Sequence, residues 1–141
     1  MALEKKMLAN GQKAFQRLDR EDRSLVYRDW LRTVDTNGFW IDLDFVKWKN
    51  INGELRPVAL TDLTRTDREF VTNAYLCAII ERILYRDKQG YMLQKIGQML
   101  NVPVYLVLYP KSMSWTKVYD FAKKEWLNFT IDGWTEFLKK L

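Results

Sequence analysis

Apolar residues between Leu25 and Val34 recur every three to four positions, which is the spacing of an amphipathic helix. Aspartates shortly before this stretch are available as an N-terminal cap, and Asn37-Gly38 supplies a stop signal. The pattern therefore predicts a helix from about Arg20 to Val34.

The next two segments alternate with a period near two, which is typical of β-strands. The first, Phe39 to Trp48, is rich in aromatic and β-branched residues, and the second runs from Leu55 to Thr64. Asn52-Gly53 lies between them, and Asn-Gly between two such runs is a strong hairpin signal. We predict an antiparallel pair of strands.

A helical crossover is predicted after the hairpin. Thr66 and Glu69 have the T-x-x-E spacing of a capping box, and apolar residues follow at helical intervals. The helix is expected to start at Asp67 or Arg68. Gly90 is expected to interrupt it, and a second amphipathic segment follows.

The last third of the chain completes a small mixed sheet. Val102 to Tyr109 is an almost continuous apolar run, as in an interior strand covered on both faces. A right-handed crossover makes this strand parallel to the second strand. Trp115 to Phe121 indicates a further strand, and Trp134 to Leu141 a closing helix. The predicted fold class is α/β: an antiparallel hairpin, a helical crossover to a parallel strand, and flanking helices.

Length and composition indicate a packed protein. The chain has 141 residues, of which 48% are hydrophobic and 14% aromatic, a composition far too apolar for disorder. No apolar run approaches the roughly 20 residues of a membrane-spanning helix. We expect a single domain over residues 1–141, in the cytoplasm and without a membrane partner.

The sequence excludes several kinds of chemistry. It contains no histidine, which removes Ser-His and Cys-His catalysis and the usual zinc sites. Phosphate-binding glycine loops of the Walker and dinucleotide types are absent. Cys77 is the single cysteine and lies in an apolar stretch, where we expect it in the core. The net charge of +5 is compatible with a nucleic-acid partner.

Three aspartates stand where strands are predicted. Asp42 and Asp44 interrupt an aromatic strand, and Asp62 lies near the end of its partner. Aspartate is disfavoured in strands, and an unpaired carboxylate in a sheet costs free energy. Their presence needs a reason, and two are considered: a functional site, or surface carboxylates on a solvated face of the sheet.

The register of the hairpin decides whether these carboxylates share a face, because a slip of one residue reverses every side chain. A two-residue turn at Asn52-Gly53 pairs Asp44 with Thr61, so that Asp44 and Asp62 point apart. A three-residue loop pairs Asp42 with Asp62 and leaves Asp44 diagonal on the same face. A shared site is expected to need the second register.

Asp44-Phe45-Val46, the short hairpin and the segment Arg56 to Arg65 together resemble the PD-(D/E)xK superfamily of restriction-endonuclease-like folds. In that superfamily an aspartate on one strand and a D/E-x-K on the next bind Mg²⁺ and activate water against a phosphodiester. The resemblance spans about Arg20 to Tyr109 and implies a divergent member with a restriction-endonuclease-like fold.

The resemblance implies that Asp44 and Asp62 are catalytic residues that ligate Mg²⁺ or Mn²⁺, with the carbonyl of Leu63 as a candidate third ligand. Thr64 stands at the position of the motif lysine and cannot carry a positive charge. Arg65 is the catalytic candidate in its place. Lys47 and Lys49 are nearby alternatives, although Lys47 and Arg65 are expected on the other face.

The implied function is a metal-dependent DNA endonuclease or exonuclease. The basic residues expected to bind nucleic acid are Arg65, Arg68, Arg82, Arg86 and Lys95. The missing lysine leaves a second reading open: a non-catalytic nucleic-acid-binding or protein-interaction module on the same fold. In that case a homo-oligomer or a protein partner is expected.

Overall fold

The computed structural model describes residues 25–35, 37, 41 and 43–141. The chain divides into two units, Met1–Trp40 and Ile41–Leu141. The described helix of the first unit is α2 (Leu25–Val34), which confirms the end of the helix predicted there. The start predicted at Arg20, and Asp42, lie outside the described residues.

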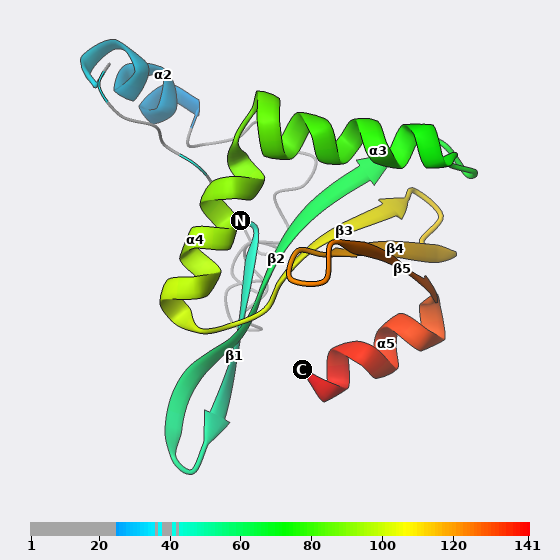
Figure 1. Ribbon diagram of the computed structural model, residues 1–141. Coiled ribbons are helices and arrows are strands. Elements are labelled where there is room, and N and C mark those ends of the chain that lie inside the picture. Colours follow the sequence, from blue (N-terminus) through cyan, green and yellow to red (C-terminus); the bar gives the residue numbers. More distant parts are fainter. Residues whose placement is uncertain (1–24, 36, 38–40, 42) are drawn as a thin grey trace, which may run out of the picture. The chain divides into compact units, whose positions relative to one another are not determined.

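The second unit is built on a five-stranded mixed sheet with the order β1-β2-β3-β4-β5 (Figure 1). Its strands are β1 (Phe45–Ile51), β2 (Glu54–Thr66), β3 (Val104–Pro110), β4 (Trp115–Asp120) and β5 (Glu125–Thr130). β2 and β3 are parallel, and all other neighbours are antiparallel. The predicted hairpin, the crossover to a parallel strand and the mixed sheet are confirmed.

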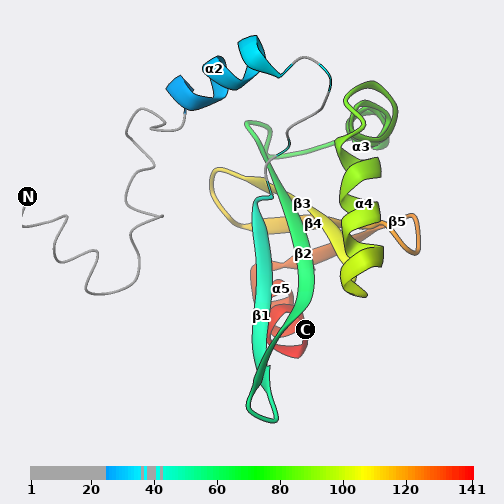
Figure 2. The same ribbon diagram turned by 90° about the vertical axis from the view of Figure 1, so that its left-hand side faces the viewer.

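Helices cover both faces of this sheet. The crossover consists of α3 (Asn73–Glu81), a π-helical turn η2 (Arg82–Arg86) and α4 (Gln89–Leu100). α5 (Ile131–Lys140) follows β5. Figure 2 shows α3 and α4 on one side of β2, and the β1–β2 hairpin extending beyond the rest of the sheet.

Each face has its own apolar core. On the α3/α4 face, Leu76, Ile79 and Leu93 pack with strand residues that include Leu60 and Leu106. On the α5 face, the core residues are Tyr105, Val107, Val118 and Trp134, with Leu63 packed against them. Successive residues of β3 thus enter opposite cores, which confirms the interior strand predicted from its continuous apolar run.

The crossover helix begins later than its capping-box signal predicted. α3 starts at Asn73, where the hydroxyl of Thr72 accepts the N–H of Tyr75. Thr66 is instead the last residue of β2, and its buried hydroxyl accepts from the N–H of Arg68 and the hydroxyl of Tyr75. Pairing of β2 with β3 extends to Thr66, so sheet hydrogen bonds take the residue that the local pattern assigned to a helix cap.

Three further expectations are corrected. The crossover breaks at Asp87 and Lys88, and Gly90 lies inside α4, in close contact with Ile83. β5 was not predicted, because its turn from β4 contains no glycine, proline or asparagine; the Asp120 carboxylate caps that turn instead. Cys77 is exposed, because the buried stripe of α3 is formed by its neighbours.

Gly97 permits the closest approach of α4 to the sheet. A Cβ at this position would overlap Cγ2 of Val104 and lie 3.1 Å from the carbonyl oxygen of Val102. Since α4 carries Gln89 at its first turn, the packing at Gly97 also sets where the start of α4 lies over β2.

Gly97→Ala is expected to lower the free energy of unfolding by about 1–3 kcal/mol, because neither the strand nor the carbonyl can move away cheaply. Urea denaturation measures the change. Gln98→Ala is the control, since it introduces the same residue at the neighbouring position of α4, where the side chain is exposed. Equal stability of the Gly97→Ala variant and the parent protein would contradict this account of α4 packing.

Candidate functional site

The β1–β2 hairpin combines a tight turn with a bulge. Ile51 pairs with Glu54 across a two-residue turn, and both turn residues, Asn52 and Gly53, have positive φ as a type I′ turn requires. The first of the two registers considered is therefore correct at the turn, and the three-residue loop is wrong.

The register then shifts by one residue. Trp48 pairs with Pro57, whereas Lys47 pairs with Ala59, so Val58 is an extra residue in β2. Proline has no N–H to give to the ladder, and bulges are among the few places where a strand tolerates it. The shift changes which residues oppose each other along the rest of the hairpin.

The bulge brings Asp44 and Asp62 together. Beyond it Phe45 pairs with Thr61, which is the last pair of β1 with β2. Asp44 directly precedes β1 and would stand opposite Asp62 if this register continued, and its carboxyl group is close enough to that of Asp62 for a hydrogen bond. The Asp44 carboxylate also accepts the backbone N–H of Leu63 at 2.8 Å, which ties it to β2. The convergence thus arises with the two-residue turn, and the expectation that it needed a longer loop is wrong.

Asp62 is buried in a way that is costly for a carboxylate. It is only 6% exposed, whereas Asp44 is exposed. The pKa of Asp62 is raised from 3.8 to about 7. The largest cause is burial, followed by a hydrogen bond to the Asp44 side chain and repulsion by its charge, while the Leu63 N–H acts in the opposite direction. Without a cation, the Asp62 carboxyl group therefore favours holding a proton below about pH 7.

Gln89 is a site residue that the sequence did not reveal. It is the first residue of α4, and its side-chain amide nitrogen lies 3.4 Å from each carboxylate oxygen of Asp62. The turn at Asp87 and Lys88 directs it there; Lys88 adopts a left-handed conformation. Its only sequence signal is a position just after a helix break, which many surface glutamines share.

The donor set fits a hard divalent cation. Mg²⁺ is commonly bound through one or two carboxylates, with waters and substrate phosphates filling its other positions. Asp44 and Asp62 supply two carboxylates, and the Gln89 amide lies beside them. Within the described part of the chain, no group of three or more histidine, cysteine, aspartate or glutamate residues is placed to hold a metal. The cluster is therefore limited to two acidic side chains among these residues.

The basic residues expected at the site are distributed over both faces. Arg65 is three positions after Asp62 on β2, so its side chain lies on the opposite face of the sheet. Its guanidinium lies 3.8 Å from the Asp67 carboxylate. Lys47 donates to the carbonyl of Leu138 in α5, which confirms its place on the other face. Neither side chain joins the carboxylate pair.

Two other basic side chains rest on aromatic rings of the crossover. The Arg68 guanidinium lies 4.5 Å from the centre of the Tyr75 ring. The Lys95 amine lies 5.4 Å from the centre of the Tyr91 ring, on the exposed side of α4. These contacts hold the two charges near the surface of the helices, away from the carboxylates of β2.

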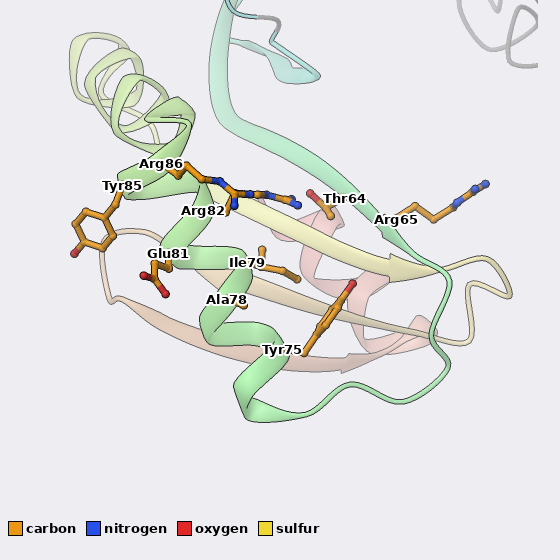
Figure 3. Close-up of a pocket in the computed structure, with 9 residues that line it drawn as sticks. All are labelled: Thr64, Arg65, Tyr75, Ala78, Ile79, Glu81, Arg82, Tyr85 and Arg86. Atoms are coloured by element: carbon orange, nitrogen blue, oxygen red, sulfur yellow. The ribbon is translucent and has the colours of Figure 1, made fainter.

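Arg82 and Arg86 lie on the face that carries Asp62. They line a cavity of about 650 Å³ together with Thr64, which follows Asp62 by two residues on the same side of β2. Figure 3 shows both arginine side chains extending from η2 toward Thr64, while Arg65 extends away. Each of the two arginines is also within 3.7 Å of a carboxylate oxygen of Asp87.

No family model, curated protein or solved structure matches this chain. Among the helices that the structure describes, none has the length and apolar character to cross a membrane.

The raised pKa of Asp62 predicts a pH-dependent stability. Its folded pKa, about 7, lies above 3.8, so the stabilisation from the bound proton is complete below about pH 4 and is lost as the pH rises toward and past 7. The loss is on the order of 4 kcal/mol. In metal-free buffer, the urea midpoint of the parent protein is expected to fall between pH 5 and pH 8.

In Asp62→Asn this fall should be much smaller, since the amide does not titrate. Asp132→Asn, a change of the same kind at an exposed position of α5, should keep the parent profile. An unchanged pH profile in Asp62→Asn would show that Asp62 does not carry the titration.

Proposed function

We propose that this protein is a metal-dependent nuclease of the PD-(D/E)xK type that acts on DNA, with Asp44 and Asp62 as the ligands of Mg²⁺ or Mn²⁺. The observation that carries the proposal is the meeting of these two carboxylates on one face of the hairpin, produced by the bulge at Val58. Such a pair is unfavourable alone, and a cation removes the repulsion.

In this proposal, different side chains hold the metal ion and the substrate phosphates. Asp44 is held by the Leu63 N–H, and Asp62 is held beside the Gln89 amide, so both carboxylates are preset in position. A bound divalent ion would polarise a phosphodiester oxygen and lower the pKa of a water molecule. Arg82 and Arg86 offer positive charge for the substrate phosphates, in place of a lysine at position 64.

The Gln89 amide supports the same proposal. Nitrogen and oxygen of a side-chain amide are interchangeable by a half-turn, so Gln89 can present either a donor to Asp62 or an oxygen to a cation. In the second orientation it extends the two carboxylates to three oxygen ligands.

The cleavage test compares the parent protein with Asp62→Ala on plasmid and on single-stranded DNA, in Mg²⁺ or Mn²⁺. The parent is expected to cleave, and Asp62→Ala to lose at least about a hundred-fold in rate, since a metal-stabilised step is worth several kcal/mol. Asp132→Ala, at an exposed position of α5, is the control and should keep the parent rate. No cleavage, together with salt-sensitive DNA binding, would favour the non-catalytic nucleic-acid-binding module.

Metal binding has a separate readout. Mn²⁺ is expected to raise the melting temperature of the parent protein by several degrees at pH 8, because a ligand at about 100 times its Kd stabilises the folded state by about 2.7 kcal/mol. Asp44→Ala should show little shift, and Asp132→Ala the full shift. Equal shifts in Asp44→Ala and the parent protein would rule out this pair as the metal site.

A further inference from the structure

The cavity beside the carboxylate pair has two chemically different ends. At one end are the guanidinium groups of Arg82 and Arg86, directed toward Thr64 (Figure 3). At the other end the Tyr75 ring lines the cavity, and Ala78 and Ile79 of α3 lie between the two ends. A ligand that fills this space therefore needs an anionic group at one end and a flat or apolar group at the other.

The charged end is the one nearer the proposed metal site. The chain passes from Arg86 through the turn to Gln89, whose amide contacts Asp62. At the other end, the Tyr75 hydroxyl donates to the hydroxyl of Thr66, which lies four residues after Asp62 on β2. Four residues of a strand span about 13 Å at roughly 3.3 Å per residue. The cavity therefore runs along β2, away from the carboxylates.

The size and charge of the cavity limit what it accepts. Its volume of about 650 Å³ lies within the range of roughly 300–1,000 Å³ found for pockets that hold a single small ligand. Arg82 and Arg86 extend into it and Glu81 lines its edge, so the balance of charge favours an anion. The contacts of Arg82 and Arg86 with Asp87, at 3.7 Å and largely exposed to solvent, are weak enough for a phosphate to compete.

We propose that this cavity holds one unpaired nucleotide of the substrate strand, with its phosphate between Arg82 and Arg86 and its base against Tyr75. The proposal rests on the nuclease function proposed above and specifies its substrate as single-stranded or unpaired DNA. In an intact duplex the faces of the bases are covered by stacking, so no base can lie flat against Tyr75 unless it is flipped out. An exposed strand offers both parts at once, and aromatic stacking binds bases with little sequence preference.

Binding without metal separates this proposal from cleavage. In EDTA, fluorescence anisotropy compares a labelled single-stranded oligonucleotide with the same sequence as a duplex. The parent protein is expected to bind the single strand at least ten-fold more tightly. Thymidine 5′-monophosphate should compete for the site, and inorganic phosphate at equal concentration should compete less. Equal affinity for the two DNA forms, or no competition by the nucleotide, would overturn the proposal in the parent protein itself.

Substitutions test whether Arg82 and Arg86 bind the phosphate. Arg82→Gln combined with Arg86→Gln should weaken single-strand binding about ten-fold and make the slope of log K against log salt shallower by about 0.7, as for one phosphate that is no longer neutralised. Lys140→Gln changes an exposed charge on α5, and two-fold or less is expected. A double variant that binds like the parent protein would overturn the assignment of the charged end.

The apolar end has its own pair of variants. Ala78→Trp fills the cavity from an exposed position of α3 and should weaken single-strand binding about ten-fold, whereas Met99→Trp, at an exposed position of α4 that does not line the cavity, should not. Unchanged binding in Ala78→Trp would overturn the proposal.

The two proposals fail separately. If the protein binds single strands through the cavity but cleaves no DNA, the nuclease function is contradicted and the nucleotide site is supported. Cleavage of duplex that is indifferent to the double arginine change and to Ala78→Trp keeps the nuclease and removes the nucleotide site.

Discussion

Val58 has no partner on β1, and this single unpaired residue determines which side chains meet at the end of the hairpin that is farther from the turn. Without it, the two-residue turn would set Asp44 opposite Thr61, and the two carboxylates would lie on opposite faces of the ribbon. With it, the Asp44 carboxyl group is close enough to that of Asp62 for a hydrogen bond, and the Leu63 N–H fixes its carboxylate. One extra residue, next to a proline, thus brings the carboxylates of Asp44 and Asp62 together.

The Asp44–Asp62 carboxylate pair is unfavourable for folding, and contacts elsewhere in the second unit hold it in place. Asp62 loses water where α4 covers β2, and close packing at Gly97 keeps α4 near the sheet. Burial and the neighbouring charge both act against the ionised form of Asp62. Groups held in such a state by surrounding structure are typical of sites where binding a ligand restores the balance. A cation between the carboxylates is a ligand that does so.

The fold was largely predictable because its signals are periodic. Alternation gave the hairpin strands, and the continuous apolar run of Val104–Pro110 gave the interior parallel strand. The start of α3 was not predictable locally, because Thr66 and Thr72 carry similar capping signals and only the pairing of β2 with β3 chooses between them. β5 was missed because its turn depends on the Asp120 side chain and not on glycine or proline.

The candidate site was predictable in part, and its limits have a physical cause. The choice of Asp44 and Asp62 came from the sequence, but their register did not, because counting from a turn assumes an unbroken ladder. Pro57 was the available sign that the ladder breaks. Gln89 and the arginines of η2 reach β2 only through the crossover, which brings together residues at least 18 positions apart. No short-range pattern encodes such a contact.

The position of positive charge follows from the same geometry. Side chains that share the face of Asp62 are at alternate positions of the described hairpin strands: Val46 on β1, and Leu60, Thr64 and Thr66 on β2. None of these is basic. Lys47 and Arg65 occupy the intervening positions, and Lys47 is engaged with α5. In the function that we propose, the positive charge for substrate phosphates therefore comes from the helix layer above, where η2 carries Arg82 and Arg86 beside Thr64. Threonine at position 64 is thus compatible with the phosphate binding that we propose, provided that the helix layer and the strand act as one site.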